Sequence, residues 1–145
     1  MRWDCRKACV VTAVERKCGV VRIGALPRAT VEHTNSRLIK ILRNEPHPVH
    51  TITSDNGVEF HGYKEIERQL NTTVYFATPH HAWERGTSEN TNGLIRQYLP
   101  KGTSLANLSQ ARCNHIAAEL NHRPRKRLGY RTPHEVYHES VRRTR

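Results

Sequence analysis

Residues 85–101 read Arg-Gly-Thr-Ser-Glu-Asn-Thr-Asn-Gly-Leu-Ile-Arg-Gln-Tyr-Leu-Pro-Lys, a pattern that predicts a short amphipathic helix. The Gly, Thr and Ser residues are typical of a helix start, and proline cannot continue a helix. One face of this helix is a polar stripe of Glu89, Asn92, Gly93 and Arg96. The apolar stripe beside it consists of Leu94, Ile95, Tyr98 and Leu99. An acid, an amide, a glycine and a cation on one face suit a site for metal and phosphate.

A second acidic segment lies upstream, at residues 53–60 (Thr-Ser-Asp-Asn-Gly-Val-Glu-Phe). A strand predicted at Val49 to Ser54 would place Asp55 at its carboxyl end, and 33 residues separate Asp55 from Glu89. Each acid also has a simpler interpretation taken alone. Asp-Asn-Gly favours a plain turn, and an acid in a first helical turn is favoured by the helix dipole.

The other predicted elements alternate between strands and helices. Three strands are predicted from β-branched and apolar runs, at Ala8 to Glu15, Val20 to Leu26 and Thr72 to Ala77. Helices are predicted from Thr30 to about Arg43, from Tyr63 to Leu70, from Ser109 to Leu120, and from a capping box at Thr132-Pro133-His134-Glu135. With the strand ending at Ser54, this order indicates a mixed α/β domain.

The chain is strongly basic. Its 145 residues suit one domain, and 24 Lys and Arg against 13 Asp and Glu give a formal charge of +11. Such an excess favours a polyanionic partner, because binding releases counterions from a phosphate backbone. The last 25 residues hold eight Lys or Arg and two Glu, and we interpret residues 141–145 as a solvated basic tail after a domain at 1–140.

The cysteine pattern favours a reducing compartment. Cys5, Cys9, Cys18 and Cys113 form no C-x-x-C pair, and the sequence shows no signal peptide or long apolar run. We therefore expect free thiols, no membrane contact and a cytoplasmic, nucleoid-associated location in a bacterium. The histidines lack the spacing of a zinc site.

Together these segments resemble the insertion-sequence-30 family of bacterial transposases. The resemblance runs from about Val10 to about Tyr137 and includes residues 14–17 (Val-Glu-Arg-Lys), residues 121–129 (Asn-His-Arg-Pro-Arg-Lys-Arg-Leu-Gly) and Thr132-Pro133. It implies a ribonuclease H-like mixed sheet flanked by helices, with the first strand shortened or missing. It also implies that Asp55 and Glu89 are the second and third members of the Asp-Asp-Glu triad shared with retroviral integrases.

The implied chemistry is DNA strand cleavage followed by transfer of the freed 3′-hydroxyl. The carboxylates of Asp55 and Glu89 would bind Mg²⁺ or Mn²⁺, two ions when the site is complete. Asp4 is the only candidate for the first Asp. It lies 11 positions before Glu15, a shorter separation than is usual in the family, so we expect an N-terminally truncated core of doubtful activity.

Several polar residues are expected to contact DNA. The set comprises Arg85, Asn92, Arg96, Lys101, Arg123, Arg125, Lys126 and Arg127. An exposed helix face is nearly as good an interpretation of Asn92 and Arg96. Trp83 is equally consistent with base stacking and with packing under the site.

The expected partners are insertion-element ends and target DNA, with a second copy or a full-length transposase as a possible protein partner. The main alternative function is a non-catalytic DNA-binding or subunit-interaction remnant. A simple ribonuclease H-like nuclease ranks last, because it does not explain the match at residues 85–101.

Overall fold

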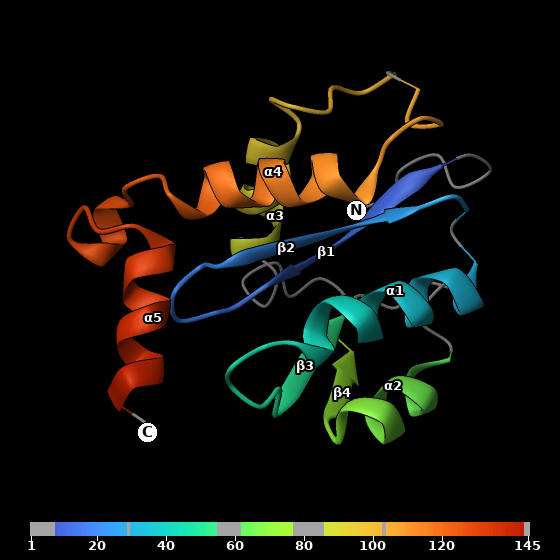
Figure 1. Ribbon diagram of the computed structural model, residues 1–145, viewed down its shortest axis with the longest axis horizontal. Coiled ribbons are helices and arrows are strands. Elements are labelled where there is room, and N and C mark those ends of the chain that lie inside the picture. The colour runs from blue at the N-terminus through green and yellow to red at the C-terminus, as the bar shows by residue number, and fades with distance from the viewer. Residues whose placement is uncertain (1–7, 29, 55–61, 77–85, 103, 144–145) are drawn as a thin grey trace.

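The computed structural model describes residues 8–28, 30–54, 62–76, 86–102 and 104–143, with residues 86–89 described in their backbone alone. Within these ranges, strands and helices follow the mixed α/β order that the sequence predicts. The elements are β1 (Cys9–Val14), β2 (Val21–Leu26), α1 (Val31–Arg43), β3 (Thr51–Ser54), α2 (Tyr63–Leu70), β4 (Thr73–Phe76), α3 (Gly86–Ile95), α4 (Gln110–Asn121), the 3-10 helix η3 (Lys126–Leu128) and α5 (Pro133–Arg143) (Figure 1).

β1 and β2 form an antiparallel hairpin in which Cys9 lies opposite Leu26 and Val14 opposite Val21. The turn between them needs a glycine, since Gly19 has φ +77°. The carboxylate of Glu15 accepts hydrogen bonds from the backbone N–H groups of Lys17 and Cys18, so this side chain closes the turn. Glu15 therefore has a structural task in the segment 14–17.

β3 and β4 form a parallel pair with Thr51 opposite Thr73 and Ser54 opposite Phe76. The crossover helix α2 is held to α1 at Gly62, whose carbonyl accepts from Nδ2 of Asn35 (3.0 Å). A Cβ on Gly62 would lie 2.5 Å from that nitrogen, so only glycine allows this approach. Among the described residues the strands form two separate pairs, β1–β2 and β3–β4.

Helices cover both faces of the β1–β2 hairpin. On one face, α3 and α4 bury Val10, Val21 and Ile23 under Ile95, Ile116 and Leu120. On the other face, α1, α2 and the β3–β4 pair enclose a second core, built on Cys9, Val11, Leu26, Leu38 and Ile66. Figure 1 shows the hairpin between α4 above and α1 below.

The C-terminal helix α5 covers the end of the hairpin where its turn lies (Figure 1). Tyr137 packs with Cys18 and Val20, and Val141 packs against the same cluster. The predicted capping box is confirmed, because Thr132 Oγ1 accepts from the N–H of Glu135 (3.1 Å) and Glu135 Oε2 accepts from the N–H of Thr132 (2.8 Å). α5 extends to Arg143, so residues 141–143 of the predicted tail are helical.

The predicted elements agree with the observed ones within a residue or two, with one larger difference at the end of α3. That helix ends at Ile95, although the sequence predicts helix up to Pro100. The chain tightens instead: the N–H of Gln97 donates to the carbonyl of Leu94 and that of Tyr98 to Ile95. Such tighter bonds are common in the last turn of a helix.

Candidate functional site

The two predicted carboxylates belong to elements that pack on opposite faces of the β1–β2 hairpin: Glu89 is on α3, and Asp55 follows β3 in the sequence. Asp55 follows β3 directly, at the edge where the parallel strands β3 and β4 both end. Asp4, Asp55 and Arg85 lie outside the described residues, as do Asn56, Glu59 and Trp83. What the structure adds is the anchoring of the chain on either side of the Asp55 segment, at Ser54 in β3 and at Gly62 against Asn35.

Glu89 lies in the first half of α3, as predicted, and its side chain lies outside the described set. One turn later, Oδ1 of Asn92 accepts a hydrogen bond from the hydroxyl of Thr12 on β1 (3.3 Å). Ile95 and Leu99 are buried in the core, which confirms the predicted apolar stripe. These contacts fix the rotation of α3 about its axis, and with it the direction of the polar stripe.

The rest of the polar stripe is partly accessible. A Cβ at Gly93 would meet no atom within 4 Å, so this position is open on the surface of α3. Arg96 is half-buried and Lys101 is exposed. Open backbone beside a cation is an arrangement that lets a phosphate approach closely.

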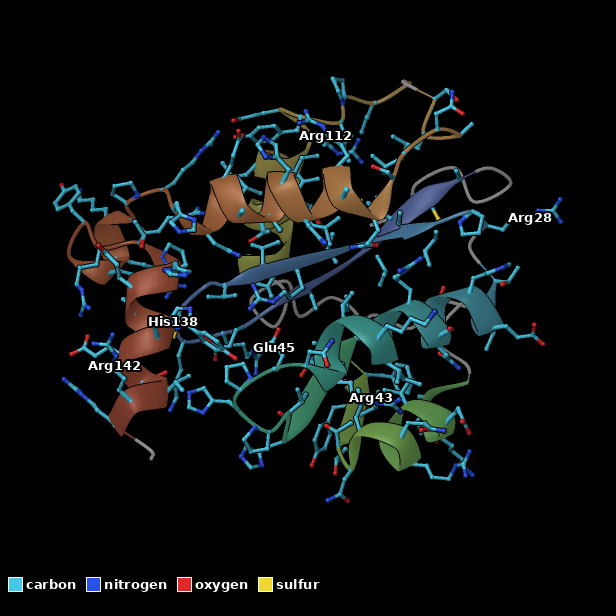
Figure 2. The ribbon with its side chains drawn as sticks, viewed as in Figure 1. Arg28, Arg43, Glu45, Arg112, His138 and Arg142 are labelled. Atoms are coloured by element: carbon cyan, nitrogen blue, oxygen red, sulfur yellow. The ribbon has the colours of Figure 1, made fainter. Side chains whose placement is uncertain are left out.

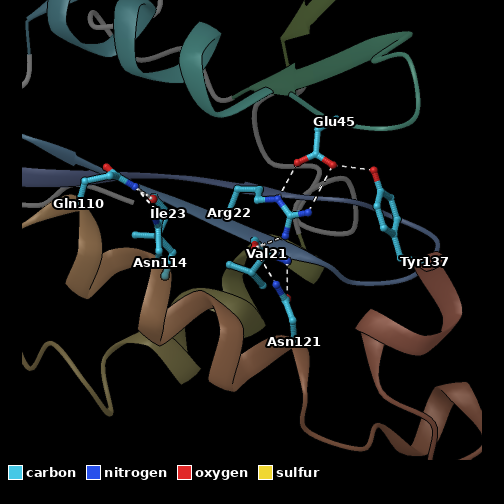
Figure 3. A network of polar contacts seen from close by, with 8 residues as sticks. All are labelled: Val21, Arg22, Ile23, Glu45, Gln110, Asn114, Asn121 and Tyr137. Carbon is cyan, nitrogen blue, oxygen red and sulfur yellow. Dashed lines mark hydrogen bonds and ion pairs between the residues drawn. The ribbon is translucent and has the colours of Figure 1, made fainter. Parts of the chain in front are cut away.

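A polar network holds the elements around this face together (Figure 3). Glu45 binds Arg22 (Nε to Oε1, 2.6 Å) and accepts from the hydroxyl of Tyr137 (2.6 Å), so it joins β2 to α5. Burial and the Glu45 charge raise the pKa of Tyr137 far above its usual value. No local sequence pattern predicts this cluster, because Glu45 is 23 residues from Arg22 and 92 residues from Tyr137.

Side-chain amides of α4 cover the outer edge of β2. Asn121 accepts from the N–H of Val21 (2.7 Å) and donates to its carbonyl (3.0 Å). Gln110 accepts from the N–H of Ala25 (3.0 Å) and donates to the carbonyl of Ile23 (2.8 Å). The two amides replace the partners that a neighbouring strand would supply, so this edge is not free to pair.

Positive charge is spread over the molecule. Figure 2 shows Arg28, Arg43, Arg112 and Arg142 at well-separated places on the surface. A groove of about 490 Å³ between α1, β2 and α4 adds a further cationic surface, and its charged lining residues are Arg22, Arg37 and Lys40. Net charge alone therefore does not define a path for DNA.

The described residues contain no group of three or more His, Cys, Asp or Glu side chains placed to hold a metal ion. Nor does any helix among them have the length and apolar character needed to cross a membrane. Cys9, Cys18 and Cys113 are buried free thiols, as predicted, and burial raises the pKa of Cys18 to about 11.

No protein-family model matches the chain. Curated proteins do match it. The chain is 49% identical over 100 residues to the transposase for insertion sequence element IS4351 of Bacteroides fragilis, covering 69% of this chain and 31% of that protein. It is 40% identical over 131 residues to the IS1086 transposase of Cupriavidus metallidurans, covering 90% of this chain and 39% of the relative. The chain is related to the insertion-sequence transposases.

The transposase InsI of element IS30A from Escherichia coli is 38% identical over 133 residues, which confirms the resemblance to the insertion-sequence-30 family. That match covers 91% of this chain and 35% of InsI, so the chain spans between about 31% and 39% of these three relatives. What those longer transposases do is therefore not shown for this chain.

Solved structures establish the fold. The catalytic core domain of BIV integrase matches with a TM-score of 0.71 at 22% identity, over 99% of this chain and 93% of that domain. A chain from the simian T-cell lymphotropic virus intasome structure matches with a TM-score of 0.71 at 18% identity, over 89% of this chain and 48% of its own length. The predicted ribonuclease H-like fold is confirmed.

The transposase-like segment 121–129 has extensive internal contacts. Arg123 donates to Oε1 of Gln97 (3.3 Å) and lies over the ring of Tyr98 (5.4 Å). Arg125 is half-buried and donates to the carbonyl of Leu120 (3.1 Å), and Arg127 donates to the carbonyl of Lys17 (3.1 Å). These bonds attach the segment to the ends of α3 and α4 and to the hairpin turn. Their role in DNA binding stays a prediction.

Proposed function

We propose that the chain is the catalytic core region of a transposase, which cuts DNA and joins the freed 3′ end to target DNA by phosphoryl transfer. The observation that carries the proposal is the placement of α3. The Thr12–Asn92 hydrogen bond holds this helix against β1, with Glu89 one turn before the contact. In sequence, Asp55 comes directly after Ser54, the last residue of β3, so the two proposed carboxylates belong to separate elements of the fold.

The donor set fits a hard divalent cation. Carboxylate oxygens from Asp55 and Glu89 are ligands that Mg²⁺ and Mn²⁺ prefer, with water and phosphate oxygens as further ligands. When bound, two such ions supply activation of the attacking oxygen and stabilisation of the leaving oxygen. The task of the protein is to hold the two carboxylates and to keep α3 in a fixed orientation on the hairpin.

Cations near the polar stripe would hold the DNA. Arg96 and Lys101 follow the end of α3 at Ile95, and Gly93 leaves the helix surface open between Glu89 and Arg96 in the sequence. The side chain of Lys126 is exposed and forms no hydrogen bond or ion pair within the described part of the chain, so its charge is available to a phosphate. We propose DNA as the partner, held mainly through its backbone.

A second candidate is a folded module that binds DNA or another transposase subunit without cutting. It is favoured by the two hydrophobic cores, which described residues alone build around Ile95 and Leu38. A chain with an incomplete triad would therefore remain folded. Association with a second copy or with a full-length transposase also belongs to this proposal, and light scattering of the purified chain would measure it.

The metal site is tested by titration calorimetry with Mn²⁺. We expect weak binding by the wild type, and a loss of at least about tenfold in affinity for Glu89→Gln and Asp55→Asn, because each removes one charged ligand. The matched control is Glu32→Gln, which changes an exposed acid in the first turn of α1 and should leave binding unchanged. Equal binding by the wild type and Glu89→Gln would remove Glu89 from the site.

Activity is tested with Mg²⁺ and element-end DNA. We expect at most trace nicking and no strand transfer, because Asp4 is too close in sequence to Glu15 to occupy the position of the first triad member. Efficient strand transfer that disappears in Asp4→Asn would show that Asp4 completes the triad. Such a result would favour the enzyme over the non-catalytic module.

DNA binding is tested through its salt dependence. Each phosphate contact contributes roughly 0.7–0.9 to the slope of log K against log[salt], so Lys126→Gln and Lys101→Gln should each lower that slope by about this amount. Lys64→Gln is the control, because Lys64 is an exposed lysine on α2, outside the proposed contact surface. The absence of any binding at low salt would contradict the nucleic-acid function itself.

A further inference from the structure

Tyr130 combines two properties that are seldom found together. Its side chain is 69% exposed, the largest exposure among the large hydrophobic side chains of the described residues. Its backbone is in the left-handed region, with φ +65°, where a Cβ crowds the neighbouring carbonyl oxygen. The residue therefore bears a backbone strain that no burial of its ring offsets.

The other non-glycine residue with positive φ among the described residues shows what an ordinary case looks like. Asn71 has φ +50° at the C-cap of α2, a position and a residue type for which this conformation is favoured. Tyrosine has no such preference. The preceding residue, Gly129, also has positive φ (+65°), so this turn uses a glycine at one position and a tyrosine at the next.

The loop around Tyr130 is rigidly built. The N–H of Arg125 donates to the carbonyl of Arg131 (3.0 Å), and the N–H of Tyr130 donates to the carbonyl of Arg125 (2.9 Å). These bonds close residues 125–131 into a compact turn around η3. Arg127 secures the turn to the hairpin through the carbonyl of Lys17. An aromatic side chain on such a support loses little freedom when it binds a partner.

Cations accompany the ring on the same closed turn. Lys126 and Arg127 are exposed, and the ammonium group of Lys126 has no partner among the described residues. Arg131 is paired with Glu139 (2.6 Å), so its charge is neutralised within the protein. An exposed aromatic ring and an available ammonium group on one turn are the two groups that single-stranded nucleic acids bind, one for the base and one for the phosphate.

We propose that Tyr130 is a stacking platform for an unpaired DNA base, with Lys126 contacting a neighbouring phosphate. The base must be unpaired or at a strand end, because inside a duplex both faces of each base are covered by its neighbours. This inference rests on the proposed function in that it takes DNA as the ligand. It adds a contact on the segment 125–131, which is separate from α3 in the sequence.

The test compares stability with binding, because the two roles of Tyr130 predict opposite results. Tyr130→Gly removes the ring and also removes the steric conflict, since glycine populates positive φ without penalty. If the ring serves binding, the variant melts at the same temperature as the wild type or higher, and binds single-stranded DNA about tenfold more weakly. Tyr130→Phe keeps the ring and should bind like the wild type.

Binding is measured with a short single-stranded oligonucleotide that carries 2-aminopurine, whose fluorescence is quenched when the base stacks on an aromatic ring. We expect quenching with the wild type and Tyr130→Phe, none with Tyr130→Gly, and none with 2-aminopurine inside a blunt duplex. The matched control is Tyr75→Thr, because Tyr75 is also exposed (56%) but lies on β4 with an ordinary backbone.

Three outcomes would overturn the proposal: unchanged quenching with Tyr130→Gly, equal loss with Tyr75→Thr, or a lower melting temperature for Tyr130→Gly. The last would show that the ring stabilises the fold, and Tyr130→Asn, which also tolerates positive φ, would check it. Salt-dependent DNA binding by the wild type without quenching would defeat this inference and leave the proposed function standing. If the wild type bound no DNA at all, both this inference and the proposed function would be wrong.

Discussion

Asn121 gives the sharpest test of how this fold is held together. Its amide is 4% exposed and forms two hydrogen bonds with Val21, a residue 100 positions away whose own exposure is 0%. In Asn121→Ala the N–H of Val21 loses the side-chain acceptor that it has at this buried strand edge. The carbonyl keeps a longer contact from Arg22 (3.3 Å).

The cost follows from these groups. A buried N–H without a partner costs about 1–3 kcal/mol, and the second lost hydrogen bond adds about 0.5–1.5 kcal/mol. We expect Asn121→Ala to lower the free energy of unfolding by about 2–4 kcal/mol. In urea this moves the midpoint by roughly 1–2 M, at the slope expected for a chain of this size.

The matched control is Asn114→Ala on the same helix. Asn114 is exposed and accepts one hydrogen bond from Gln110 (2.8 Å), so its removal should change the unfolding free energy by less than about 0.5 kcal/mol. Equal effects of the two substitutions would refute the reasoning, because they would show that the amide of Asn121 does not cover the edge of β2.

A second substitution tests the same contact through pH. In Asn121→Asp the protonated acid can still donate to the Val21 carbonyl, whereas the carboxylate cannot. Burial also disfavours the charged carboxylate, so the pKa of Asp at position 121 in the folded state is raised above the unfolded value of about 3.9. The neutral form is then favoured in the fold. Stability relative to the wild type should be best near pH 4 and should fall as the pH rises. A difference from the wild type that is the same at pH 4 and pH 7 would contradict the two-bond geometry.

Two further predictions concern other contacts. Tyr137→Phe removes the hydrogen bond to Glu45 (2.6 Å) and should lower the free energy of unfolding, measured in urea, by about 1–2 kcal/mol. Tyr63→Phe is the control. If the two variants were equally stable, the hydroxyl of Tyr137 would contribute nothing to stability. Burial opposes ionisation of Glu15, but the N–H groups of Cys18 and Lys17 outweigh it and hold the pKa of Glu15 below its usual value. The stabilisation is therefore present above the unfolded pKa, and the advantage of wild type over Glu15→Gln should shrink below about pH 4.5. An advantage that is constant from pH 7 to pH 3.5 would exclude this role for the carboxylate.

Much of the fold is predictable because its signals are local. Thr30 and Ser109 accept from the N–H three residues later and so fix the starts of α1 and α4, and the Thr132–Glu135 pair does the same for α5. Each signal spans four residues, which is why the sequence is enough to locate them. The end of α3 was placed too late because the choice between a regular and a tightened last turn leaves no comparable mark.

The contacts of the site region could not be predicted, for a physical reason. The side chains that support it meet across 80 to 100 residues, as in the Thr12–Asn92 and Asn121–Val21 pairs, and a polar residue carries no sign of its distant partner. The role of Glu15 in the hairpin turn was missed although its partners are two and three residues away. An acid followed by a turn with Gly19 could have indicated it. Asp4, Asp55 and Arg85 stay predictions because they lie outside the described residues.

The motifs by which this chain resembles transposases mix two kinds of residue. Glu15, Asn121 and Arg125 are occupied by contacts within the fold, so their presence indicates a preserved scaffold. Those contacts would persist in a chain that has lost its chemistry. Lys126 and Tyr130 share the same loop, but their side chains are exposed and have no side-chain hydrogen bond within the described residues that explains them. Substitutions in the first group should therefore lower stability more than DNA affinity, and substitutions in the second should lower DNA affinity without changing stability. This difference distinguishes a protein that still binds DNA from one that has kept only the fold.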